Sequence, residues 1–476
     1  MTRRSAATTG GSAPTAPGGT ADLVLLGGAV LTMDETGSRA DAVAVADGRI
    51  LAVGARAEIE PLIGDGTRVI ELDGRAVLPG INDSHLHATW LGARWPHTFF
   101  GAPDPEAAAQ VSGVLAADRE ARRTAILTAG RMLSEVGITS YTEPGIGPGE
   151  DDGETGCFHS EVLDVYRELA AAGELRQRVT MLALYGVLDG PSDVETVLSG
   201  IRERAVAAPE PDPAWLNVPG VKIFGDLIPL SRQAWTERPY DDGTHGDLLV
   251  NGGSIEQKAE RLAEMIRSAH AAGLQIGLHA TGDRTIGLAL DAIADAAAQP
   301  GAPSAQQLGH VIIHGDLATA EQVRRMAELG VWLNAQPGIA SITGAWLTAM
   351  MGPDAAAEAW QFGAALDAGV LMLSSDAPVL HHDWRHWIAA AEERIVAMGG
   401  DASPDAARAR LHRLLRAYTA VPAAQDRAAS WKGTVEVGKV ADLVVLARDP
   451  FEVGAAGLPE VPVDLTVLDG RVIFER

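Results

Sequence analysis

The middle of the chain alternates short apolar runs with longer stretches of helical periodicity. Stretches such as EVLDVYRELAAAG and IEQKAERLAEMIRSAHAAG place apolar residues at helical spacing among Glu, Arg and Ala. Between these stretches lie eight apolar runs, each suited to one buried strand: 78–87, 138–142, 179–184, 221–224, 274–279, 310–314, 331–335 and 370–374. Eight strand–helix units over about 340 residues predict an α/β fold of the (β/α)₈ TIM-barrel type.

Both ends of the chain have a different pattern. Residues 21–77 contain DLVLLGGAVLTM, AVAVADGRILAVG and RVIELDGRAVL, in which Gly or Asp-Gly breaks each apolar run. Near the other end, the same pattern returns in TVEVGKVADLVVLARD and VDLTVLDGRVIFE. Neither end has enough short strands for a stable sheet alone. We therefore expect one small β-sandwich domain built from residues 21–77 and 425–476, with the barrel at 78–424.

Composition narrows the class of protein. The 476 residues include 38 Lys and Arg against 63 Asp and Glu, and the resulting net charge of −25 argues against a nucleic-acid partner. No uncharged apolar run approaches the roughly 18 residues of a spanning helix, so no membrane association is expected. Residues 1–20 lack the apolar stretch of a secretory signal and are expected to be a disordered tail. A single cysteine, Cys157, excludes an internal disulfide, and a cytoplasmic protein is expected.

Polar side chains cluster where the predicted barrel strands end. His85 and His87 in PGINDSHLH are two residues apart, so both leave one face of a strand. In LQIGLH, His279 lies opposite the aliphatic face, and the same alternation is expected to place His310 and His314 of HVIIH on one face. The carboxyl ends of barrel strands meet at one face of the barrel. The imidazoles and one carboxylate that converge there predict a metal centre at His85, His87, His279, His314 and Asp376.

Lys222 is an unusual residue within an apolar strand. The chain has only four lysines, so arginine stands at most positions where any cation would serve. A lysine in GVKIFGD therefore suggests that a primary amine is needed there. It could pair with a carboxylate such as Asp226, or react as a neutral amine with carbon dioxide to give a carbamate that bridges two metal ions. Glu143, at the end of the second strand, is an alternative bridging ligand or an acid at the pocket edge.

The motifs that contain these residues resemble those of the amidohydrolase superfamily. Within it, the chain is similar to the YtcJ-like amidohydrolase group that contains N-substituted formamide deformylase. The resemblance covers residues 21–476. PGINDSHLH, VKIFGD and QIGLHATGDRTIGLALDAI resemble the family's strands one, four and five. VIIHGD, NAQP and SSDAPV resemble the motifs of strands six to eight, and GTVEVGKVADLVVLARDP resembles the closing signature of the β-sandwich.

The resemblance implies a barrel flanked by a β-sandwich and a binuclear metal centre. It implies the following ligands: His85, His87 and Asp376 on one ion, His279 and His314 on the other, and a carboxylated Lys222 between them. Imidazole and carboxylate donors suit zinc, so one or two zinc ions are expected.

Two positions beside these motifs depart from the family's pattern. Leu227 follows Asp226 where a glycine is usual, and Ile313 precedes His314 where a glutamate is usual. Both substitutions predict a narrower and less polar pocket. Histidines and tryptophans also follow the first and eighth strands, where loops roof a barrel. The candidate pocket residues are therefore Trp90, Trp95, His97, Asp226, Leu227, Ile313, His381 and His382.

The expected reaction follows from these groups. A metal-activated water would attack a carbonyl carbon, and Asp376 would carry the proton of that water to the leaving nitrogen. The expected activity is hydrolysis of a non-peptide C–N bond in a small neutral or cationic amide, with N-substituted formamides and acetamides as first compounds to test. A deaminase or a cyclic imide or lactone hydrolase could use the same centre. A non-catalytic metal-binding protein is the alternative of another class. Expected partners are the amide substrate and, in a homodimer, a second copy of the chain.

Overall fold

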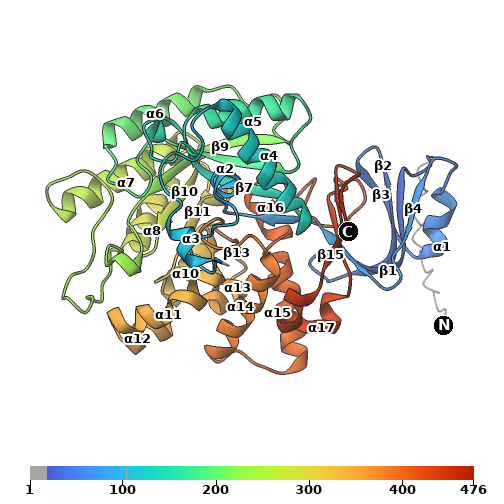
Figure 1. The fold of residues 1–476 in the computed structure, drawn as a ribbon. Coiled ribbons are helices and arrows are strands. Elements are labelled where there is room, and N and C mark those ends of the chain that lie inside the picture. The colour runs from blue at the N-terminus through green and yellow to red at the C-terminus, as the bar shows by residue number, and fades with distance from the viewer. Residues whose placement is uncertain (1–18, 103) are drawn as a thin grey trace, which may run out of the picture.

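The computed structural model describes residues 19–102 and 104–476, which form two eight-stranded sheets with helices around one of them (Figure 1). The predicted tail at residues 1–20 falls outside the described residues except for its last two positions. None of the described helices is long and apolar enough to cross a membrane.

The first sheet is the predicted barrel, and every strand pairing in it is parallel. Its strands follow one another in chain order: β6 (Ile81–Asp83), β7 (Ile138–Ile146), β8 (Arg178–Leu184), β9 (Leu216–Phe224), β10 (Gln275–Ala280), β11 (Val311–His314), β12 (Trp332–Ala335) and β13 (Leu371–Leu373). The segments after the first and last strands meet, because the amide of Asp376 donates to the carbonyl of His85 at 2.9 Å. The predicted (β/α)₈ architecture is confirmed.

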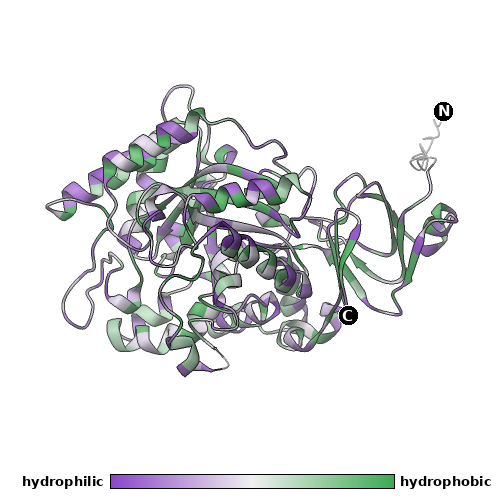
Figure 2. Cartoon of the chain, turned by 45° about the horizontal axis from the view of Figure 1, so that its top comes forward, coloured by the Kyte–Doolittle hydropathy of each residue, from purple (hydrophilic) through white to green (hydrophobic). Residues whose placement is uncertain are grey.

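Helices surround this barrel (Figure 1). They are α2 (Ala88–Arg94), α3 (Pro105–Ala109), α4 (Arg119–Glu135), α5 (Glu161–Ala171), α6 (Val194–Val206), α7 (Ile255–Ala271), α8 (Asp283–Ala297), α9 (Ala305–Leu308), α10 (Ala320–Leu329), α11 (Pro337–Met351), α12 (Pro353–Glu358), α13 (Phe362–Asp367), α14 (Trp384–Ala397), α15 (Pro404–Arg416) and α16 (Ala420–Gln425). Hydrophilic and hydrophobic residues alternate along many of them (Figure 2), as expected for helices with one buried face.

Helix α7 shows how the sequence sets these boundaries. Ser254 caps its first turn, since the Ser254 hydroxyl accepts from the amide of Gln257 while the Gln257 side chain returns to the Ser254 amide. The chain leaves the helix at Gly273, whose φ of +72° lies in the left-handed region. Between these ends, Leu262 and Ile266 are buried against the barrel core.

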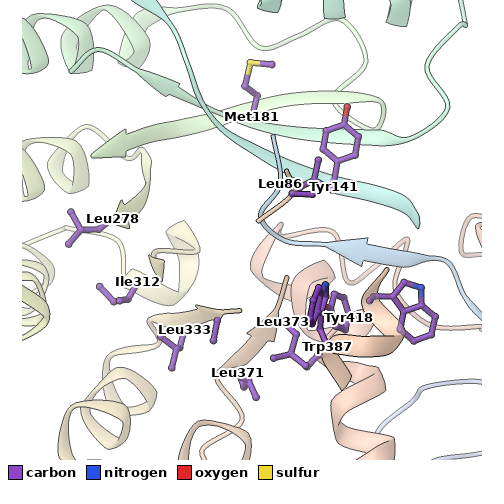
Figure 3. Packing of buried hydrophobic residues seen from close by; sticks show 14 of the residues in the cluster. Leu86, Tyr141, Met181, Leu278, Ile312, Leu333, Leu371, Leu373, Trp387 and Tyr418 are labelled. Carbon is purple, nitrogen blue, oxygen red and sulfur yellow. The ribbon is translucent and has the colours of Figure 1, made fainter. Parts of the chain in front are cut away.

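The core between the barrel strands and the surrounding helices contains a row of aliphatic residues held in register across neighbouring strands. Leu278, Ile312, Leu333 and Leu371 are consecutive cross-strand partners on β10 to β13, and all belong to one buried cluster (Figure 3). On the other face of the same strands, a side chain at Gly277 would contact Leu182 of β8. Since β8 and β10 are not neighbours in the sheet, that face lines the barrel interior.

The second sheet is built from both ends of the chain and lies to one side of the barrel (Figure 1). Its strands are β1 (Leu23–Leu31), β2 (Arg39–Ala46), β3 (Arg49–Gly54), β4 (Arg68–Glu71), β5 (Ala76–Pro79), β14 (Leu443–Leu446), β15 (Val463–Leu468) and β16 (Arg471–Glu475). Two short helices accompany it, α1 (Arg56–Ile59) and α17 (Pro450–Gly457). Strand β5 pairs with β1 on one side and with β14 on the other, so it joins the two chain ends. One apolar cluster includes Leu25 and Val43 from the first end and Val445 and Leu465 from the last.

The structure divides the first predicted strand, residues 78–87, between the two sheets. Its first residues belong to β5 in the second sheet, and β6 in the barrel begins at Ile81. Gly80 lies between them and passes so close to β7 that a Cβ there would lie 2.0 Å from the Thr139 hydroxyl. The apolar character is continuous across this junction, which is why hydrophobicity alone predicts one strand.

Candidate metal centre

Three predicted ligands converge where the first and last barrel strands end. His85 and His87 follow β6, and Asp376 follows β13. The Asp376 Oδ1 lies 3.2 Å from His85 Nε2 and 3.6 Å from His87 Nε2. One ligand atom from each residue lies within 4.8 Å of the others, and all three residues are buried. Two imidazoles and a carboxylate at this separation are a donor set that suits a divalent metal ion.

Glu143 of β7 orients His87. Its Oε1 lies 3.0 Å from His87 Nδ1, and its Oε2 accepts from the amide of Ala88 at 2.6 Å. A carboxylate on one ring nitrogen fixes the tautomer and leaves the other nitrogen for a metal. Because both oxygens of Glu143 are engaged, the geometry favours this orienting role over that of a bridging ligand.

The second predicted histidine pair lies beside the first. His279 is the last residue but one of β10, and His314 ends β11. Their ring centroids lie 4.4 Å apart, and the ring of His314 lies 5.3 Å from that of His85. The His279 ring stacks on Phe224 at 5.0 Å. Its Nε2 is buried and has no hydrogen-bond partner among the described residues. A buried polar atom usually has a partner, so this ring nitrogen is available to bind a metal ion.

The expected alternation fails at His314. Its backbone adopts a φ of +74°, which turns the side chain into the site at the end of β11. The prediction that His310 shares this face is wrong: His310 points outward to helix α7, where its Nε2 lies 2.9 Å from His270 Nδ1. Ile313 instead belongs to the buried cluster of Val311 and Met372 inside the barrel.

Gln336 orients His314 and was not predicted to do so. Its Oε1 lies 2.8 Å from His314 Nδ1, while its Nε2 donates to Asn334 Oδ1 at 2.7 Å and to Ser374 Oγ at 2.9 Å. These two acceptors fix the amide orientation, so Oε1 accepts from the imidazole. The sequence motif NAQP holds a signal for this role, because alternation puts Asn334 and Gln336 on one strand face.

Lys222 of β9 reaches the same site, and no hydrogen bond or ion pair joins its amine to another of the described residues. Its side chain is buried and lines the cavity above the histidines, with Nζ 4.8 Å from the centre of the Phe224 ring. It does not pair with Asp226, whose carboxylate accepts from the amides of Thr281 and Gly282, both at 2.9 Å. Burial lowers the pKa of Lys222 to about 8, although the charges of nearby carboxylates oppose this shift.

Burial also controls the charge of the other groups. It lowers the pKa of His85 and His279 well below the usual value for histidine and that of His314 to about 3. It raises the pKa of Asp376, against the pull of the neighbouring imidazoles. His85, His279 and His314 are therefore neutral near pH 7, which is the state in which an imidazole nitrogen binds a metal ion.

A cavity of about 360 Å³ opens over these groups. Its walls are mostly apolar and aromatic, and they come from loops and helices at the carboxyl ends of the strands. Besides the candidate ligands, the lining includes Trp90, Phe99, Phe100, Phe158, Leu188, Asp189, Phe224, Asp316 and Trp360. A site of this kind suits a small ligand with an apolar group.

Of the eight predicted pocket residues, Trp90 lines this cavity. Trp95 is exposed and packs against His382, and His381 stacks on Trp387 with ring centroids 4.2 Å apart. The structure places the remaining seven outside the lining: Trp95, His97, Asp226, Leu227, Ile313, His381 and His382. The lining residues that the sequence did not indicate are mostly aliphatic residues and phenylalanines, together with Asp189 and Asp316.

Fold and site together define a parallel (β/α)₈ barrel whose candidate metal centre lies at the carboxyl ends of the strands. Residues 103–474 match the Amidohydrolase family, and the chain belongs to this family. The family resemblance read from the motifs is confirmed.

Two curated relatives and one solved structure show how similar the chain is to known proteins. It is 29% identical over 317 residues to N-substituted formamide deformylase of Arthrobacter pascens, and the match covers 66% of this chain but 55% of the deformylase. It is 24% identical to YtcJ of Bacillus subtilis (strain 168), described as an amidohydrolase, over 94% of this chain and 99% of that protein. An uncharacterized metal-dependent hydrolase from Pyrococcus horikoshii OT3 has the same fold, with a TM-score of 0.70, 19% identity, and coverage of 91% and 99% of the two chains.

Proposed function

We propose that this chain is a metal-dependent amidohydrolase that cleaves a non-peptide C–N bond in a small amide. The observation that carries the proposal is the convergence of His85, His87, His279, His314 and Asp376, with Lys222, at the base of one mostly apolar cavity. Family membership supports a hydrolase, and the geometry supports a metal centre.

The residues present fit one or two divalent metal ions. The unpartnered Nε2 of His279 and the two Nε2 atoms directed at Asp376 are available ring nitrogens. His85, His87 and Asp376 would hold one ion, and His279 and His314 the other. A carboxylated Lys222 would contribute the shared ligand. Zinc suits these donors, and a bound ion would supply a Lewis acid for the substrate carbonyl and lower the pKa of water.

The chain's own residues account for the remaining parts of the reaction. The carboxylate of Asp376 accepts a proton from the attacking water and delivers it to the leaving nitrogen, since an amide anion is a poor leaving group. Glu143 and Gln336 hold His87 and His314 in fixed tautomers through their Nδ1 atoms. The aromatic walls exclude bulk water from the reacting centre.

A product assay tests this proposal. Zinc-loaded protein is incubated with N-benzylformamide, N-benzylacetamide, a cyclic imide, an N-acyl amino acid and an amino-substituted heterocycle. We expect benzylamine together with formate or acetate. Ammonia released from the heterocycle alone would show a deaminase, and ring opening of the imide alone would show a cyclic amidase. Either result would overturn the proposed substrate class while leaving the metal centre in place.

A further inference from the structure

Asp189 is a carboxylate of the cavity that the proposed reaction does not use. It lies in the loop after β8 and lines the cavity together with Lys222 and Asp376. Its side chain is open to solvent within the cavity. Neither a hydrogen bond nor an ion pair from another described residue reaches its carboxylate. The surrounding cavity walls partly desolvate the carboxylate, and this desolvation raises its pKa, as expected for a carboxylate that lacks hydrogen-bond donors.

The loop holds Asp189 in a defined conformation. Its φ of +52° lies in the left-handed region, which aspartate adopts at less cost than most residues. The preceding residue is fixed, because the amide of Leu188 donates to Glu150 Oε1 at 2.7 Å. The amide of Val187 also donates to the Ser192 hydroxyl at 3.1 Å. The carboxylate is therefore presented to the cavity from a backbone that is hydrogen-bonded on its N-terminal side.

Outside the candidate metal centre, the side-chain charges that line the cavity favour a cation. Asp316, the other carboxylate apart from the candidate ligands, already accepts from the indole nitrogen of Trp360 at 3.0 Å. Within the described chain, no arginine lines the cavity, and its one lysine is Lys222 in the metal site. The charges of Lys222 and Asp376 influence the pKa of Asp189, so Asp189 lies within Coulombic range of the reacting centre.

The remaining walls suit a short carbon chain. Trp90 packs against Phe99 at 4.9 Å and against Phe158 at 5.4 Å between ring centroids, which gives a continuous aromatic surface. Methylene groups gain free energy from burial against such a surface, and aromatic faces also attract cations. A ligand with one amide, a short apolar chain and one positive charge matches all three features.

We propose that Asp189 is a specificity-determining residue that binds a protonated amine of the substrate while the substrate amide lies at the metal centre. The substrate class is then mono-N-acylated diamines. This inference rests on the proposed amidohydrolase function and restricts its substrates to amides that carry a protonated amine.

Two substrates of equal length test the inference. Zinc-loaded protein is assayed with N-(4-aminobutyl)acetamide and with N-pentylacetamide, in which a methyl group replaces the ammonium group. A hydrogen bond to a charged partner corresponds to about tenfold or more in kcat/KM. We expect the wild type to prefer the ammonium substrate by that factor, and Asp189→Asn to lose the preference through a higher KM for that substrate alone. Asp152→Asn, an exposed acid in the loop after β7, controls for net charge and should keep the preference.

Three outcomes would overturn the inference: equal turnover of both substrates by the wild type, an equal loss on both substrates in Asp189→Asn, or the same loss in Asp152→Asn. Calorimetric binding of the two compounds separates this inference from the proposed function. If the protein hydrolyses no amide but binds the ammonium compound in an Asp189-dependent manner, the function fails and the cation site stands. If it hydrolyses amides without preference, the cation site fails and the function stands.

Discussion

Two of the candidate ligands depend on an uncommon backbone conformation. His314 and Asp376 have φ values of +74° and +56°, and each follows or ends a barrel strand. Non-glycine residues adopt this region rarely and at a cost, so the surrounding structure must stabilise it. At each of the two residues, the left-handed backbone conformation directs the side chain into the site. The chemistry of the centre therefore depends on local backbone geometry that a strand pattern cannot reveal.

Asp376→Asn tests the proton transfer. Asparagine tolerates the left-handed region and has nearly the same shape, so we expect the fold to persist. The variant cannot carry a proton, and kcat should fall by about 10² or more. Steady-state kinetics and metal analysis are measured on the same preparation, because Asp376 is also a candidate ligand. Normal metal content with near-normal kcat would remove Asp376 from the mechanism.

Lys222→Ala and Lys222→Arg test the proposed carbamate. Guanidinium cannot form a carbamate, so both variants should lose metal and activity to a similar extent. Acetate or propionate added to the alanine variant should restore part of both, because a free carboxylate can occupy the bridging position. Lys258→Arg, at an ion pair on the surface helix α7, is the matched control and should behave as the wild type. Full activity in Lys222→Arg would exclude a carbamate.

Hydrophobic periodicity predicts most of the strands and helices of this fold. The alternation in LQIGLH correctly places His279 at the site, and Gln275 and Gly277 face the barrel interior with it. Alternation fails one strand later, where the left-handed turn at His314 changes the direction of the side chain. It also cannot separate β5 from β6, since both are apolar.

The residues of the cavity walls are harder to predict, because apolar and polar residues follow no regular spacing in loops. Trp90 lies on the first turn of α2, directly after His87, and lines the cavity. Trp95, at the end of the same helix, faces away. Asp189 lies in a loop whose direction depends on a hydrogen bond from the Leu188 amide to Glu150, a residue far from it in sequence. Contacts of this kind leave no local signal in the sequence.

Asp226 follows β9 and is expected to hold the loop at Trp235 and the start of α8 together, rather than to contact substrate. Besides Thr281 and Gly282, its carboxylate accepts from the amide of Trp235 at 3.0 Å and the hydroxyl of Thr285 at 2.7 Å. Asp226→Ala leaves these buried donors unpaired, so the free energy of unfolding should fall by about 3 kcal/mol or more. Urea denaturation measures this loss. Asp295→Ala, at an exposed position of α8, is the control that removes the same charge. It should change the free energy of unfolding by less than about 0.5 kcal/mol.

The whole molecule should depend on metal for both activity and stability. Ligands come from opposite ends of the barrel sequence, so a bound ion ties the first strand to the last. Purified protein should contain one to two equivalents of a divalent metal by elemental analysis. Chelation should abolish activity and lower the Tm, because an ion that binds only the folded state stabilises it. Zinc should reverse both effects. Full activity after complete removal of metal would contradict the proposed centre.

The second sheet can be completed only at the end of translation. Strand β5 needs β14 as a hydrogen-bonding neighbour, yet the whole barrel is translated between them. At roughly 5–20 residues per second, the N-terminal strands wait tens of seconds on the ribosome with one edge and an apolar face exposed. A nascent chain is thus open to aggregation or chaperone binding until its last few dozen residues emerge, and those residues complete the first part to be made.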